Sequence, residues 1–226
     1  MTRPLLLAID PSLRCTGWLL VALDGTAELV AAGAVQTEPH AAQKDPFILR
    51  MRDDAYAAYA LQRGIEEVVA AYPSIEQVAI ENLTGPHTRR RRGTKRCPAC
   101  GDDGARMDTF AFAKGARAQQ AILAALHPGD TGLRPLFVST YAAKESATGR
   151  RRPKRGKNDV ADRVRARWGA PAWDRVIRGD AGAREAIYDA GAVALFALED
   201  VEVLRVIENY RREYAPRRHV HEREDR

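Results

Sequence analysis

The stretch that decides the fold is Leu5-Leu6-Leu7-Ala8-Ile9-Asp10, close to the start of a chain of 226 residues. Five apolar residues in a row indicate a strand that is buried on both of its faces. A carboxylate that directly follows such a strand is held by stiff backbone at the edge of the core. Asp10 therefore either caps the turn that begins at Pro11-Ser12 or binds a hard cation, which prefers oxygen ligands.

The segments that follow predict two more strands and a long helix. A tight turn leads from Asp10 into an apolar run at residues 19–23, and Asp24-Gly25 is typical of a two-residue hairpin turn. A third strand is expected at about residues 28–35. Together these strands form an antiparallel meander with Asp10 on its first member. A helix is then expected at about residues 48–72, where Pro73 ends it.

A second acid repeats the arrangement of the first. The short apolar run Gln77-Val78-Ala79-Ile80 ends in Glu81, and loop residues follow it. Neighbouring strands would place the carboxylates of Asp10 and Glu81 close together. Two negative charges that close require a cation, or one of them must be protonated.

The second half of the chain predicts mainly helices. We expect helices at about residues 108–126 and 158–168, with Asn158 as the N-cap of the latter, and a strand at 136–138 between them. Trp173 is expected in a connecting segment.

One last helix is expected from about residue 184 to residue 210. Its first half is apolar almost all round except for Asp189, a costly place for a carboxylate unless a metal or a donor meets it. The alternative role for Asp189 is a helix cap.

Positive charge is concentrated in two short windows. Residues 89–96 and 150–157 hold 12 of the 36 Lys and Arg, so the rest of the chain, with all 30 Asp and Glu, is net acidic although the whole chain carries +6. Localised positive charge on an acidic protein is typical of a protein that binds a polyanion. The alternative is a pair of solvated charged loops. We expect nucleic-acid binding.

The first basic window lies in an insert, at about residues 84–107, that contains Cys97-Pro98-Ala99-Cys100. This spacing is that of a zinc knuckle, but structural zinc requires four ligands. Two subunits of a dimer could share one Zn²⁺ through four thiolates, or His87 could complete a site within one chain. The alternative is a loop with two reduced thiols.

Composition fits one domain at residues 1–210 and a charged tail at 211–226 that we expect to be flexible. Apolar residues make up 45% and charged residues 29% of the chain, which is ordinary for a soluble protein. No apolar run approaches the length of a membrane span, and the N-terminus lacks the pattern of a signal peptide. We therefore expect a cytoplasmic protein.

The order of these elements and acids resembles the ribonuclease H-like superfamily and, within it, the RuvC-type Holliday junction resolvases. The residues that carry the resemblance are Ala8-Ile9-Asp10-Pro11-Ser12 with Thr16-Gly17, Val78-Ala79-Ile80-Glu81, the helix segment Phe112-Ala113-Lys114-Gly115-Ala116-Arg117-Ala118, the lysine-bearing loop from Lys144 to Lys157, and Asp189 with its Ala-rich continuation. Each motif is weak alone, but their order and spacing together are specific.

The resemblance implies an α/β fold with a mixed five-stranded sheet, three antiparallel strands followed by two more, flanked by helices. It implies a homodimer that cuts four-way DNA junctions by hydrolysis with two Mg²⁺ or Mn²⁺ ions. Asp10, Glu81 and Asp189 would bind the metals, and Lys157 would neutralise charge at the scissile phosphate. Further basic residues would hold DNA: Arg89, Arg90, Arg91, Arg92, Lys114, Lys144, Arg151, Lys154 and Arg155.

One departure leaves alternatives open. The family carries two aspartates three residues apart on its last helix, but here the first of them falls at Ala186, and the adjacent Glu185 is a candidate substitute as a metal ligand. Another branched-DNA nuclease of the same fold, or a junction-binding protein without activity, is therefore an alternative. Sugar kinases and actin-like ATPases share the fold, but they carry Gly where this chain has Ser12.

Overall fold

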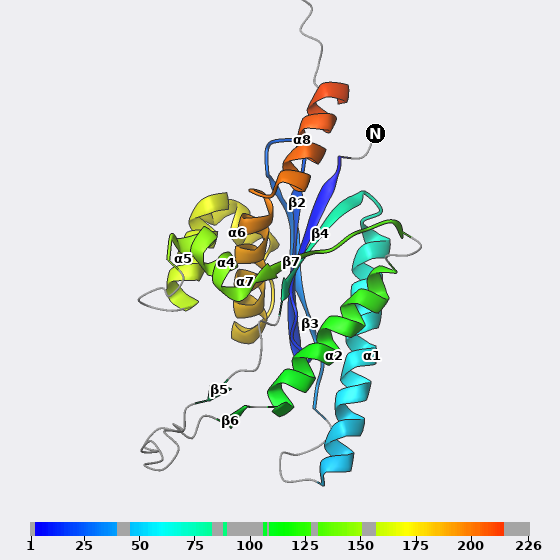
Figure 1. Cartoon of the computed structure of the whole chain (residues 1–226). Helices are drawn as coiled ribbons and strands as arrows, with labels where there is room; N and C mark the ends of the chain where they lie inside the picture. The colour runs from blue at the N-terminus through cyan, green and yellow to red at the C-terminus, as the bar shows by residue number, and fades with distance from the viewer. Residues whose placement is uncertain are drawn as a thin grey trace, which may run out of the picture.

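A five-stranded mixed sheet forms the centre of the molecule, with helices on both faces (Figure 1). The computed structural model describes residues 3–39, 46–82, 88–89, 106–107, 109–127, 131–150 and 157–214. The strand order is β3-β2-β1-β4-β7. The expected fold class, three antiparallel strands followed by two more, is confirmed.

The first three strands form the expected meander, and the other two run parallel to β1. The strands are β1 (Leu5–Asp10), β2 (Cys15–Ala22), β3 (Leu29–Gln36), β4 (Ile75–Asn82) and β7 (Leu136–Ser139). β1 pairs antiparallel with β2 and parallel with β4, and β4 pairs parallel with β7. The carboxyl ends of β1, β4 and β7 therefore meet at one edge of the sheet.

Alternate residues of β1 belong to two different cores. Leu5, Leu7 and Ile9 pack on one side of the sheet, whereas Leu6 and Ala8 pack on the other. This is the period of two that a strand imposes on its side chains. It explains why the run is apolar throughout, since both faces of the strand are covered.

Two long helices cover one face of the sheet, on the right in Figure 1. These are α1 (Phe47–Ala71) and α2 (Thr109–Leu126), both within one residue of their expected starts. Leu61 and Ile65 of α1 and Ile122 of α2 are fully buried against the odd-numbered residues of β1. Burial of these large side chains stabilises this layer by about 1.5–3 kcal/mol each.

The opposite face is covered by shorter helices (Figure 1). They are α4 (Thr140–Thr148), α5 (Lys157–Trp168), α6 (Ala170–Val176) and α7 (Ala181–Ala197), and α8 (Val201–Tyr214) follows them. α7 lies against β1, β2 and β3, and α4 and α5 pack on α7. Of the helices in the described part of the chain, none is long and apolar enough to cross a membrane.

The expectation of one helix from residue 184 to residue 210 was wrong, because the chain breaks after Ala197. α7 ends there, and Asp200 accepts a hydrogen bond from the backbone N–H of Glu202 at 2.9 Å, at the start of α8. A side chain that satisfies a free N–H at a helix start favours a new helix over continuation of the old one. The start of α7 at Ala181 is also earlier than expected.

Two further expectations in this region were wrong. Trp173 lies in α6 rather than in a connector, and its side chain is almost completely buried. Pro171 is compatible with this helix because it occupies the first turn, where a backbone N–H has no partner to lose. Asn158 is not the N-cap of α5, since the helix already begins at Lys157.

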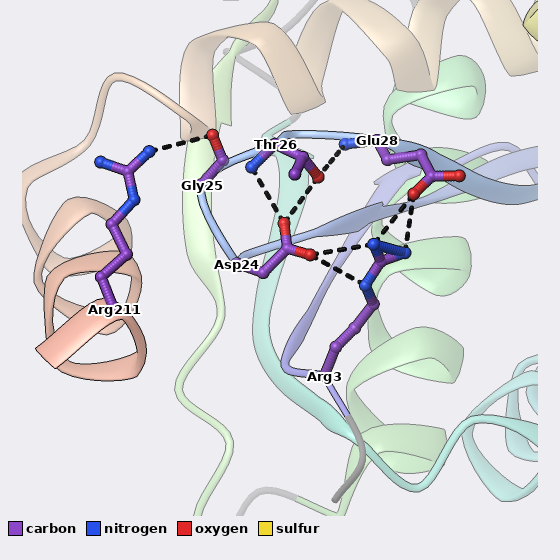
Figure 2. Close-up of polar contacts among 6 residues, drawn as sticks. All are labelled: Arg3, Asp24, Gly25, Thr26, Glu28 and Arg211. Atoms are coloured by element: carbon purple, nitrogen blue, oxygen red, sulfur yellow. Dashed lines mark hydrogen bonds and ion pairs between the residues drawn. The ribbon is translucent and has the colours of Figure 1, made fainter. Parts of the chain in front are cut away.

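The turn between β2 and β3 is longer than the expected two residues, because β2 ends at Ala22 and β3 begins at Leu29. Figure 2 shows that Asp24 organises it. The carboxylate of Asp24 accepts hydrogen bonds from the N–H and hydroxyl of Thr26 at 2.9 and 2.6 Å, and from Arg3 at 2.9 Å. Burial alone would raise the pKa of Asp24, but these hydrogen bonds and the charge of Arg3 outweigh it and lower the pKa.

The same turn also anchors the last helix. Gly25 has a φ of +89°, a conformation that favours glycine. Its carbonyl accepts a hydrogen bond of 3.0 Å from Arg211 of α8 (Figure 2). Residue 211, placed in the tail by the sequence, therefore belongs to the folded part of the chain.

The insert carries a two-stranded ladder, in which β5 (Thr88–Arg89) pairs with β6 (Arg106–Met107). The sequence indicated an insert there but no strands. Residues 90–105 lie outside the described residues, and so do Arg90, Arg91, Arg92, Cys97 and Cys100.

Candidate active site

Two carboxylates lie side by side at the edge of the sheet. Ile9 of β1 is paired with Ile80 of β4, so Asp10 and Glu81 come next on adjacent parallel strands. Ala8 and Ala79 face the core on the α7 side, and the alternation of a strand places Asp10 and Glu81 on that same side. Both residues are half-buried. The structure thus brings together the first two acids that the sequence singled out.

Helix α7 reaches this edge because of a glycine on β2. Gly17 is the register partner of Asp10. A Cβ atom on Gly17 would lie 2.0 Å from the carbonyl oxygen of Ala186, closer than any real contact. The missing side chain therefore lets the second turn of α7 lie directly against β2, beside Asp10.

The acids of α7 differ in exposure. Asp189 is half-buried and Glu185 is exposed, one helical turn before it, and both line a pocket between α5 and α7. Asp189 is not a helix cap, since Asp180 caps α7 by accepting a hydrogen bond of 2.8 Å from the N–H of Ala183. That bond, together with one from Gln36, lowers the pKa of Asp180.

Cys15, at the start of β2, lies in the negative electrostatic potential of the nearby carboxylates. Burial raises the pKa of Cys15, and the carboxylates of Asp180, Asp10 and Glu185 raise it further. The acids of β1 and α7 are therefore close enough to disfavour a thiolate between them. A region of that potential attracts cations.

The donor set fits a hard divalent cation, because Asp10, Glu81, Glu185 and Asp189 all offer carboxylate oxygens from rigid elements. Among the described residues, however, no three Asp, Glu, His or Cys side chains are gathered into a ready-made metal cage.

The lysines predicted near the site lie on different elements. Lys157 is the first residue of α5, which packs on α7, and Lys144 is half-buried on α4. Lys114 of α2 lies instead on the other face of the sheet, where its Nζ is 3.5 Å from a carboxylate oxygen of Asp54. Arg151, Lys154 and Arg155 lie outside the described residues.

Sequence reasoning missed a buried acidic pair that supports the turn after Asp10. Asp53 and Asp54 of α1 are 5% and 1% exposed. Arg14, in that turn, forms an ion pair with each of them, at 3.0 Å for Asp54. Arg117 of α2 lies 3.7 Å from Asp54. The available pattern was the spacing of four residues from Asp53 to Ala57 and Leu61, which places an acid on the buried face of the helix.

No family sequence model and no curated protein sequence matches the chain. The arrangement of strands and helices is that of the ribonuclease H-like fold, and solved structures match it. A Thermus thermophilus RuvC structure is 20% identical with a TM-score of 0.54, and the match covers 85% of this chain and 92% of that one. T. thermophilus RuvC in complex with a Holliday junction substrate is 19% identical with a TM-score of 0.57, over 92% and 97%.

A third similar structure is the yeast mitochondrial Holliday junction resolvase Ydc2, which is 10% identical with a TM-score of 0.50 over 92% of this chain and 82% of that one. At sequence identities of 20% or less, the structural similarity establishes the fold. This chain therefore has the fold of the RuvC-type resolvases, as its sequence motifs indicated.

Proposed function

We propose that this protein is a structure-selective DNA endonuclease that resolves four-way junctions by divalent-metal-dependent hydrolysis of phosphodiester bonds. The observation that carries the proposal is the placement of Asp10 and Glu81 at the carboxyl ends of adjacent strands, with α7, the helix that carries Glu185 and Asp189, packed against the register partner of Asp10. The fold supports it, since similar structures are Holliday junction resolvases and one of them holds a junction.

Asp10, Glu81 and Asp189 would hold the divalent ions, two Mg²⁺ or Mn²⁺ in each site, and Glu185 would supply the acid that Ala186 lacks. The ions would lower the pKa of a bound water and stabilise the leaving oxygen. The role of the chain is to fix the acids on stiff elements, since Mg²⁺ tolerates little distortion of its ligands.

Basic residues would neutralise and bind the phosphates of the DNA. Lys157, at the start of α5, would neutralise the charge that develops on the scissile phosphate, with Lys144 as a second candidate. The two basic windows would hold the arms of the junction by phosphate contacts that do not read sequence.

A homodimer suits this substrate, because a four-way junction presents two equivalent strands to a two-fold assembly. Two active sites would then cut opposed strands in a paired reaction. Sedimentation of the protein alone and bound to a junction would measure this, with two chains per junction expected.

Cleavage of a panel of synthetic DNAs tests the function. Four-way junctions, flaps, forks and linear duplex should be incubated with Mg²⁺, with Mn²⁺ and with EDTA. We expect symmetric cuts in the four-way junction, at least about tenfold faster than in duplex, and none with EDTA. Faster cutting of flaps or forks would favour another branched-DNA nuclease, and metal-independent cutting would contradict the mechanism.

The second candidate function is junction binding without cleavage, which the alanine at position 186 favours. This residue is only 7% exposed and lies against Gly17, so it offers no carboxylate at the place where α7 meets β2. Tight junction binding with no product under any divalent ion would support this alternative.

A further inference from the structure

A pocket of about 510 Å³ opens between the start of α5 and the first half of α7. Its walls include Asn158 of α5 and Tyr188 of α7, together with Glu185 and Asp189. It therefore shares two acids with the proposed metal site, and if these acids hold the metal ions, a group in the pocket would lie next to the reacting phosphate. A nucleobase is small enough to enter a space of this size.

An aromatic stack stiffens one wall of this pocket. The rings of Trp168 and Trp173 are 5.9 Å apart with planes 17° from parallel, and those of Trp173 and Tyr188 are 5.1 Å apart at 21°. Trp173 is buried, whereas Tyr188 is half-buried and lines the pocket. The stack thus ends in the ring of Tyr188 at the pocket, and the rings of Trp173 and Trp168 support it from behind.

Close packing of the helices preorganises the pocket. A Cβ atom on Gly191 would lie 2.4 Å from Val164 of α5 and 3.4 Å from Trp173, so this glycine lets α5, α6 and α7 meet closely. A wall that is already ordered loses little entropy when a ligand binds.

Away from the bound metal ions, the charge of the pocket favours a neutral group over a phosphate. Asp180, Glu185 and Asp189 line it with one guanidinium, that of Arg184, whose Nε donates to the carbonyl of Gly179 at 3.1 Å. A carboxylate that holds no metal ion, such as that of Asp180, repels an anion but accepts a neutral planar group. Asn158 adds an exposed amide, which can both donate to and accept from the edge of a base.

We propose that this pocket binds one nucleobase of the DNA strand being cut, beside the scissile phosphate, with Tyr188 as the stacking surface and Asn158 as the residue that distinguishes one base from another. The inference rests on the proposed endonuclease function and adds to it a determinant of cleavage position. Aromatic rings stack on any base, whereas an amide contact depends on which base is present.

The test uses the full chain and a junction whose crossover can migrate through a varied sequence. We expect the wild-type protein to concentrate its cuts at a few positions. Tyr188→Ala and Asn158→Ala should each lower the ratio of cutting between the best and worst positions about tenfold, while Tyr188→Phe keeps the preference because the ring remains. Tyr59→Ala, an exposed tyrosine on the opposite helix layer, is the matched control.

A fluorescence measurement of base binding provides a second test in case Tyr188→Ala folds poorly. 2-Aminopurine placed at successive positions near the crossover should change its emission at one nucleotide in complex with the inactive Asp10→Asn protein. Adding Tyr188→Ala should abolish that change, and adding Tyr188→Phe should retain it.

The outcomes separate the two proposals. If the wild-type protein cuts no branched DNA, the proposed function is wrong. If it cuts, but Asn158→Ala and Tyr188→Ala both keep the wild-type pattern of positions, or if no 2-aminopurine position responds, then the function stands and the pocket does not bind a base.

Discussion

The carbonyl oxygen of Ala186 on α7 lies against the Cα atom of Gly17 on β2, so closely that a Cβ atom on Gly17 would be 2.0 Å from it. Gly17 is paired with Asp10 across β1 and β2. One contact between backbones therefore sets the distance from the acids of α7 to the acids of the sheet. It also places Ala186, which offers no carboxylate, beside this pair.

This contact predicts that Gly17→Ala damages both stability and activity. Overpacking of this kind costs about 1–3 kcal/mol in the free energy of unfolding, and here α7 must shift to relieve it. Junction cleavage should fall even at temperatures where the variant stays folded, because the acids of α7 move away from Asp10. Urea unfolding and a cleavage assay measure the two effects.

Gly64→Ala is the matched control for this variant. A Cβ atom there would lie 2.7 Å from Val35, on the α1 side of the sheet. It should lower stability less than Gly17→Ala, because the neighbour is a side chain and alanine favours the helix, and it should leave cleavage by the folded protein unchanged. Equal losses of cleavage in both variants would mean that Gly17 has no special role at the site.

Asp10→Asn should abolish cleavage and preserve binding. The substitution keeps the shape of the side chain but removes a metal-binding charge, and we expect a loss of about three orders of magnitude in rate. Junction affinity should stay within about twofold, since it depends mainly on phosphate contacts. Normal cutting by this variant would show that the site lies elsewhere.

The two acids of α7 should contribute unequally. Asp189→Asn should be inactive, because a short, half-buried side chain loses little freedom on binding a metal and its carboxylate can act as a full ligand. Glu185→Gln should reduce the rate less, by about tenfold, because an exposed and longer side chain loses part of its binding energy in becoming ordered. The Mg²⁺ concentration for half-maximal rate tests metal binding directly, and it should rise in Glu185→Gln. A wild-type rate for Asp189→Asn would point to a different acid.

Asp24 gives a prediction for stability as a function of pH. Its pKa in the folded protein is lowered below the ordinary value of 3.8, so its contribution is fully present above that pH and is lost as the pH falls through the lowered pKa. Asp24→Asn should therefore destabilise the protein by about 1–2 kcal/mol at neutral pH and by progressively less below about pH 4. Unfolding in urea at several pH values would measure this.

Glu202→Gln is the control for that series, because it removes only an exposed ion pair with Arg205. Such pairs contribute little, so the change should stay below about 0.5 kcal/mol at every pH. A constant effect of Asp24→Asn down to pH 2 would contradict the assigned role of its charge.

Replacement of Arg89 to Arg92 with glutamine should weaken binding to every branched DNA alike. Each lost phosphate contact should reduce the slope of log affinity against log salt by roughly 0.9. Titrations at several salt concentrations, with junctions of different sequence, measure both effects. A loss confined to one sequence would mean that these arginines read bases.

The sequence by itself determined the sheet and two members of the site. A run of buried residues that ends in an acid is a local pattern, and Asp10 and Glu81 lie where two such runs end. The same reasoning failed at the β2–β3 turn and at the break after Ala197, because side-chain bonds of Asp24 and Asp200 decided them.

Only the tertiary structure decided which distant segments meet. Asp53 and Asp54 bind Arg14 across about forty residues of chain, and Tyr188 stacks on Trp173 beside the start of α5. Such contacts depend on how the helices pack on the sheet, and packing is set by the fit of whole surfaces rather than by local periodicity. The sequence does not show why residue 17 must lack a Cβ atom, because the reason is its contact with Ala186 of α7.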